Sequence, residues 1–183
     1  MSTFTFSDLA ATNTAVGASG ITPISAPSGF TNWPINGATD GTDTTPADGT
    51  QFVTSIYVPV NMTITGVKYL VGSVGGTDKA VVVLYSSAGA LLANSTVASS
   101  GTTVGTAAQI QTIAFTATYA AKGPALFYVG ISMNGNTARL RTVPAHCQGP
   151  LWGNSVSQTH GTPAAITAPT TFTADKAPII TLY

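Results

Sequence analysis

The chain has 183 residues and a mass of 18.4 kDa, a length that suits one domain. Only 7% of the residues are charged, against about 25% in an average soluble protein, and six Lys and Arg balance six acids, all of them Asp. Nucleic acid and anionic membranes are therefore excluded as main partners, because both are bound through basic surfaces. A surface rich in Thr, Ser, Gly and Ala loses its hydration more cheaply than a charged one, so we expect an assembly subunit; the alternative is a monomer kept soluble by hydroxyl groups.

The longest apolar runs, Ala80–Tyr85 and Ala125–Ile131, are far too short to cross a bilayer. The N-terminus, MSTFTFSDLA, lacks the basic start and apolar block of a secretory signal, which predicts synthesis in the cytoplasm. A single cysteine, Cys147, excludes an internal disulfide.

Residues 1–50 are rich in turn formers, with isolated aromatic residues between them. This pattern predicts an extended N-terminal arm or a set of loops, followed by a folded domain at residues 51–183. The candidate interface anchors of this arm are Phe4, Phe6, Phe30 and Trp33.

The first predicted strands follow directly. Phe52, Ile56, Val58 and Val60 share one parity and therefore one face of a strand, and Pro59 indicates an edge strand or a strand end. A second strand is predicted over Thr63–Val71, in which Gly66 marks a bulge that shifts the alternation.

Lys79–Tyr85 is almost continuously apolar, which predicts a strand covered on both faces. A turn at 86–89 leads into a strand at 90–97, and further strands are predicted at 109–116 and 125–133. The last of these places Phe127, Val129, Ile131 and Met133 on one face.

Asn134-Gly135 predicts a type I′ hairpin, because both central residues of that turn need positive φ. The return strand, Thr137–Val143, places Arg139 and Arg141 on one face, toward solvent or a partner. Residues 144–169 are irregular, and Ala177–Tyr183 forms a last strand.

About eight short strands at hairpin spacing predict an all-β protein, an antiparallel β-sandwich, with jelly roll as the preferred topology. The C-terminal strand is expected beside strands from the middle of the chain.

The chain offers few groups for catalysis, so we expect no enzyme and no cofactor. Glu is absent, a glycosidase would need two distant Asp side chains, and neither a GxSxG elbow nor a phosphate-binding loop occurs. His146 and Cys147 are neighbours whose side chains point apart in extended chain, so we interpret them as packing residues. Zinc would have one Cys and two histidines, His146 and His160, without a recognised spacing.

Two weaker binding hypotheses remain open. Asp40, Asp43 and Asp48 could hold Ca²⁺, although their spacing fails the EF-hand rule and turn capping explains them equally well. Trp33 and Trp152 lie in turn-rich segments, where an aromatic ring either stacks on a sugar or anchors an interface. A sugar platform could also include tyrosines, namely Tyr57, Tyr69, Tyr85, Tyr119, Tyr128 and Tyr183.

Three segments carry a resemblance to a known family: SIYVPVNMTITGVKYLVG, VVVLYSSAGALLANS and IAFTATYAAKGPALFYVGISMNGNTARLR. In the cadence of their strands they are similar to bacteriophage virion proteins of the jelly-roll type, the group of capsid decoration or cement proteins and fibre heads. The resemblance implies a non-enzymatic virion protein, made in the host cytoplasm and often trimeric, whose arm or loops clasp its own copies or the major capsid protein. The alternative within the group is a receptor- or carbohydrate-binding head on a tail fibre, which binds a host-surface glycan.

Overall fold

The structure is a computed structural model that describes residues 42–143 and 152–183. The predicted anchors Phe4, Phe6, Phe30 and Trp33 lie outside these residues, as do Asp40, His146 and Cys147. The strands are β1 (Thr42–Thr44), β2 (Thr50–Val58), β3 (Met62–Leu70), β4 (Lys79–Ser86), β5 (Leu91–Asn94), β6 (Thr102–Thr103), β7 (Ile110–Ala121), β8 (Ala125–Met133), β9 (Leu140–Thr142), β10 (Gly153–Ser157) and β11 (Ile180–Leu182), with one 3₁₀ turn, η1 (Ala98–Ser100).

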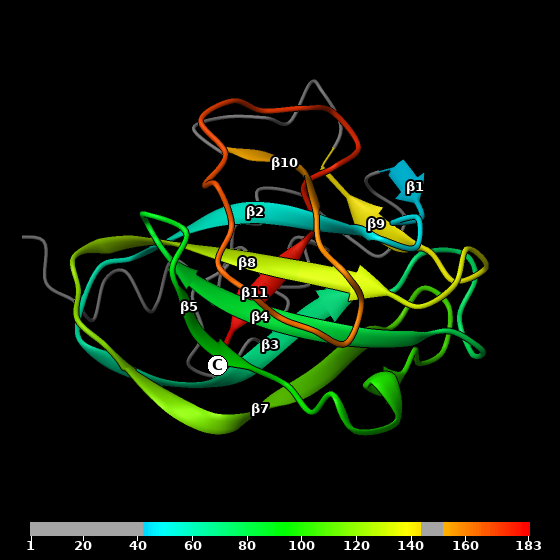
Figure 1. The fold of residues 1–183 in the computed structure, drawn as a ribbon, viewed down its shortest axis with the longest axis horizontal. Coiled ribbons are helices and arrows are strands. Elements are labelled where there is room, and N and C mark those ends of the chain that lie inside the picture. The colour runs from blue at the N-terminus through cyan, green and yellow to red at the C-terminus, as the bar shows by residue number, and fades with distance from the viewer. Residues whose placement is uncertain (1–41, 144–151) are drawn as a thin grey trace, which may run out of the picture.

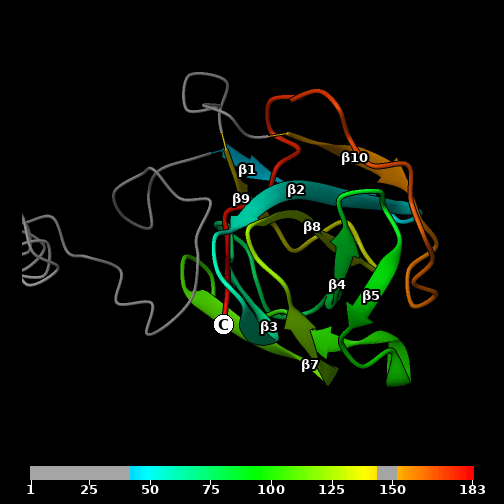
Figure 2. The same cartoon turned by 90° about the vertical axis from the view of Figure 1, so that its left-hand side faces the viewer.

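Two antiparallel sheets form a sandwich (Figures 1 and 2), which confirms the predicted fold class. The larger sheet has the order β10-β2-β8-β4-β5, with β6 added beside β4, and the smaller has the order β11-β3-β7. A third, two-stranded sheet joins β1 to β9 at one end. The eight predicted strands are all present, and β1, β6 and β10 are short additions.

Strands that are distant in sequence pair with each other. The β2–β3 ribbon runs beside the β7–β8 ribbon, because β2 pairs with β8 and β3 with β7. The β4–β5 hairpin then folds across both sheets: β4 pairs with β8, and a bridge between Ser95 and Phe115 connects the end of β5 to β7. The C-terminal β11 pairs with β3, as expected.

The core lies between the two sheets. The alternation in β8 directs Phe127, Val129, Ile131 and Met133 inward, where they meet inward residues of β2, β3 and β4. The opposite parity of β4 is also buried, in a second cluster that contains Val81, Val83 and Tyr85. The prediction that β4 is covered on both faces is therefore confirmed.

The outer cover of β4 is the segment 158–172, here named the strap (orange in Figure 1). Its Ile166 and Ala168 pack on the second cluster. Hydrogen bonds hold it along its length: His160 Nδ1 with Ser132 Oγ (3.1 Å), His160 Nε2 with Ser100 O (2.7 Å), Ile166 N to Gly89 O (2.9 Å), Tyr128 OH to Pro169 O (2.7 Å), and Gly153 N to Thr171 O (3.1 Å). The strap thus covers the middle of the large sheet with the chain's own residues.

Gly66 occupies a bulge, as predicted, since the β3–β7 register shifts between Ile64 and Gly66. A Cβ at this position would lie 2.8 Å from the Ala114 Cα, closer than real Cβ atoms approach, so the close approach requires glycine. Pro59 ends β2, which is paired on both sides and is not an edge strand. The placement of Val60 on the inward face is therefore wrong, because Val60 lies beyond the end of β2 and is 57% exposed.

The predicted hairpin at Asn134-Gly135 is wrong. Neither residue has positive φ, and β9 pairs with β1 instead of β8. The Asp78 carboxylate accepts hydrogen bonds from the N–H groups of Thr137 (2.8 Å) and Ala138 (2.6 Å), which draws the chain toward the loop after β3. A distant acceptor therefore overrides the local turn preference.

Two strands lie where the sequence predicted irregular chain. Thr42–Thr44, assigned above to the arm, forms β1 and pairs with β9, so the folded part begins at least nine residues before the predicted boundary at 51. Gly153–Ser157 forms β10 and extends the larger sheet beyond β2.

Candidate binding surfaces

The outer face of the small sheet is broad and nearly free of charge. Because Ile113 and Phe115 of β7 point inward, the alternate residues point to solvent. We name this surface the threonine face; its exposed residues are Thr63, Thr65, Thr112, Ala114, Thr118 and Ala120. Its three strands contain a single charged residue, Lys68, whose Nζ lies 5.4 Å from the centre of the Tyr183 ring. This face can be dehydrated at little electrostatic cost.

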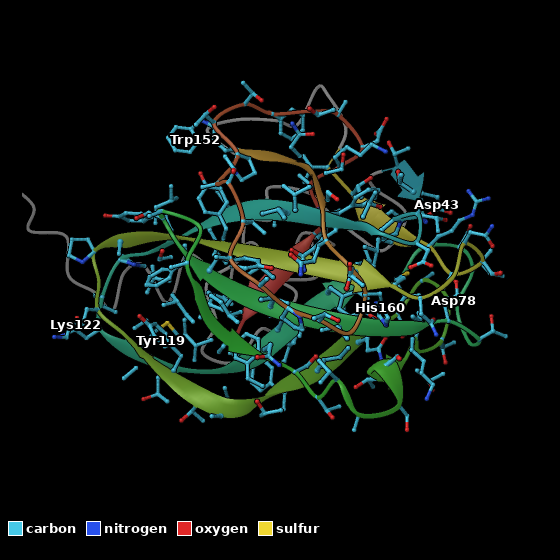
Figure 3. All side chains as sticks on the ribbon, in the orientation of Figure 1. Asp43, Asp78, Tyr119, Lys122, Trp152 and His160 are labelled. Carbon is cyan, nitrogen blue, oxygen red and sulfur yellow. The ribbon has the colours of Figure 1, made fainter. Side chains whose placement is uncertain are left out.

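Two acidic side chains, Asp43 and Asp78, lie at the same end of the sandwich, opposite to Lys122 (Figure 3). Asp43 pairs with Arg141 at 3.2 Å and accepts a hydrogen bond from Ser73 N at 3.0 Å. Asp43 thereby ties β1 to β9 and to the loop after β3. These charges fix loops in place.

The two arginines predicted on one face differ. Arg139 is exposed, as expected, but the Arg141 side chain is only 14% exposed and faces Asp43, so the prediction of a solvent-facing Arg141 is corrected. The reason is β1, which lies beside β9 and brings a carboxylate to that face.

A second surface lies at the end of the large sheet that the strap leaves uncovered. Trp152 is 45% exposed and Tyr57 is 57% exposed. Trp152 lies opposite Ser55 of β2, since Ser55 N donates to Trp152 O (2.7 Å) and Trp152 N donates to Ser55 Oγ (2.9 Å). Tyr57 lies two residues beyond Ser55 on the same face, and Leu126 is its partner on β8. We name Tyr57, Leu126 and Trp152 the aromatic shelf; Figure 3 shows Trp152 projecting from the sandwich beside β10.

Under the strap, the phenol of Tyr85 donates to Gln51 Oε1 at 2.8 Å, and both side chains are fully buried. Burial raises the pKa of Tyr85 to about 12, and this hydrogen bond opposes part of that increase. Burial also raises the pKa values of Tyr69 and Tyr128. These phenols remain neutral donors, which makes them structural groups at neutral pH.

The calcium hypothesis gains nothing from the described residues. Asp43 is engaged by Arg141, Asp48 is exposed, and Asp40 lies outside them. Within residues 42–143 and 152–183, no three His, Cys, Asp or Glu side chains gather as metal ligands. In the same residues, no helix has the length and hydrophobicity needed to cross a membrane.

Comparisons with known proteins return no match: no family model, no curated protein and no solved structure is significantly similar to this chain. The resemblance to phage virion proteins therefore stays a prediction.

Sequence reasoning identified Trp152 as a candidate and named Tyr57 only as one of six tyrosines that could belong to a sugar platform. The parity that places Phe52, Ile56 and Val58 in the core leaves Tyr57 pointing outward, so this signal was available. The proximity of Tyr57 to Trp152 could not be predicted from the sequence, because β10 was not predicted as a neighbour of β2.

Proposed function

We propose that this chain is a non-enzymatic structural protein of a phage particle, a decoration or cement subunit that binds its own copies and the shell beneath. The observation that supports this function is the threonine face. Soluble monomers keep apart through charged surfaces, and they protect exposed sheet edges with Lys or Pro. The twelve residues of β7 include neither a charged residue nor a proline.

Burial of such a face gains about 25 cal/mol for each Å² of apolar area and requires little desolvation of ionic groups. Thr and Ala are short, so they lose little rotamer entropy when a partner covers them. Contacts that repeat over a symmetric shell gain by avidity, so each can be weak. In this function the predicted anchors of residues 1–50, Phe4, Phe6, Phe30 and Trp33, add contacts with neighbouring subunits.

The test is an add-back experiment with particles that are produced by a phage from which the gene for this chain has been deleted. Purified full-length protein is expected to bind these shells at a fixed stoichiometry and to raise their disruption temperature. Thr112→Lys combined with Thr118→Lys charges the threonine face and is expected to abolish binding. Thr159→Lys combined with Thr167→Lys places the same charges on the exposed strap and serves as the control. Full occupancy by the first variant, or no binding by the wild type, would contradict the proposal.

The second candidate function is a receptor- or carbohydrate-binding head on a tail fibre. The exposure of Trp152 favours it, because a half-exposed Trp held directly before a paired strand can anchor a ligand. In this case Trp152→Ala abolishes attachment to the host surface while particles assemble normally.

A further inference from the structure

The aromatic shelf has the geometry of a preformed binding surface. Tyr57 of β2 and Trp152, the residue directly before β10, lie on one face at diagonal positions, because Trp152 is held opposite Ser55. Diagonal residues of this kind lie about 7–8 Å apart, within reach of one ligand that spans both rings. Leu126, which is partly buried, fills the sheet surface beside Tyr57.

The shelf is rigid because its supports are buried. Ser55, only 2% exposed, holds both the carbonyl and the N–H of Trp152. Tyr57 lies on β2, which is paired with β8 on one side and β10 on the other. A ligand therefore meets side chains whose backbone positions are already fixed, so binding orders little of the chain.

The strap gives the shelf a boundary. Tyr128 lies opposite Ser55 on β8, and its hydroxyl donates to Pro169 O of the strap at 2.7 Å. The strap thus crosses the sheet beside the shelf and leaves Tyr57 and Trp152 uncovered. A ligand on the rings would lie against this crossing.

The chemistry of the shelf favours an uncharged, amphipathic ligand. None of the three strands β2, β8 and β10 contains a charged residue, so an ionic ligand would gain no partner there. Asn154 shares the face of Trp152, two residues along β10. Its Oδ1 accepts a hydrogen bond from Ser155 N, and within the described residues its Nδ2 has no partner. Two aromatic rings and one amide donor therefore face the ligand.

We propose that the aromatic shelf binds a neutral glycan, with pyranose rings stacked on Trp152 and Tyr57 and a sugar hydroxyl accepting a hydrogen bond from Asn154 Nδ2. The apolar faces of a neutral sugar match the rings, and its hydroxyl groups match the amide. This inference names the ligand class of the second candidate function. It rests on that function only for the location of the shelf on a tail fibre. The decoration function depends on the opposite sheet.

The experiment uses the full-length protein and calorimetric titration with neutral oligosaccharides, namely maltohexaose, cellohexaose, mannohexaose and chitohexaose, and with heparin hexasaccharide as the charged comparison. At least one neutral sugar is expected to bind. Trp152→Ala and Tyr57→Ala are each expected to weaken that binding at least tenfold, or about 1.4 kcal/mol, and Trp152→Phe to retain most of it. Ile110→Ala is the control, because Ile110 is 42% exposed on the other sheet.

Failure of all four neutral sugars to bind, or preference for the heparin hexasaccharide, would overturn the proposal. Equal binding by the wild type and Trp152→Ala would do the same, with thermal melting used to show that each variant is folded. If the shelf is instead a contact between two copies, sedimentation will show self-association that Trp152→Ala removes and that sugars do not affect. None of these outcomes bears on Thr112 and Thr118, so the two functions are tested separately.

Discussion

Substitution of Asp78 should release the segment that connects β8 to β9. The carboxylate accepts the N–H groups of Thr137 at 2.8 Å and Ala138 at 2.6 Å. Hydrogen bonds to an ionised acceptor contribute about 1.5–3 kcal/mol each. The N–H group of Ala138 is on a fully buried residue, so the contribution of its hydrogen bond would be lost entirely. Thr137 is exposed, so water can hydrate its N–H group in part. We expect Asp78→Ala to lower the free energy of unfolding by about 2–4 kcal/mol.

Urea unfolding followed by circular dichroism measures this loss. With a slope of about 2 kcal/mol per M, the midpoint should fall by about 1–2 M while the slope stays constant. Asp78→Asn keeps one carboxamide oxygen and loses only the charge, so we expect about half the effect. Amide hydrogen exchange should accelerate first at residues 136–140. An Asp78→Ala protein within about 0.5 kcal/mol of the wild type would refute the role assigned to this carboxylate.

Three further predictions concern packing and pH. The pKa of Tyr85 is about 12 in the folded state and 10 in the unfolded chain, so the unfolded state loses its proton first and the free energy of unfolding falls between pH 10 and 12, by up to about 2.7 kcal/mol. Urea melts across this range measure the fall. Tyr85→Phe should make the free energy of unfolding depend less steeply on pH, and an unchanged dependence would exclude Tyr85 as its source. Gly130→Ala puts a Cβ 2.4 Å from the Gln51 carboxamide and should lower the free energy of unfolding by about 1–3 kcal/mol, which the thermal midpoint measures. A midpoint equal to that of the wild type would mean that the Gln51 side chain moves aside without cost. Asp43→Asn breaks the ion pair with Arg141 and should lower the free energy of unfolding by at most about 1 kcal/mol, because both side chains keep some exposure. This loss should be smaller in 1 M salt, and a loss that does not depend on salt would point to the hydrogen bond from the Ser73 amide.

Alternation of side chains predicted most of the sandwich. β8 was predicted with its observed bounds, Ala125–Met133, because a strand that packs one face on a core repeats every two residues. The apolar run of β4 and the bulge at Gly66 were equally local signals, and both are confirmed. In each case the residues themselves carried the information.

The errors arose where distant residues decide the structure. Asn134-Gly135 favours a tight turn locally, but Asp78 captures the following amides. The sequence of β10, GNSVS, has small polar residues and no clear alternation, and it is a strand because β2 supplies its partner. Arg141 could not be paired with Asp43 before β1 was known to lie beside β9. The aromatic shelf depends on the same unpredicted pairing of β10 with β2.

The strap makes the two sides of this molecule unequal. The large sheet is covered in cis by residues 158–172, whereas β7 of the small sheet exposes Thr112, Ala114 and Thr118 among the described residues. In the proposed decoration function, only the threonine face can meet the shell, so every copy would bind in the same orientation. The aromatic shelf, which lies beside the strap on the opposite sheet, would then face the medium, where we propose that it binds its glycan.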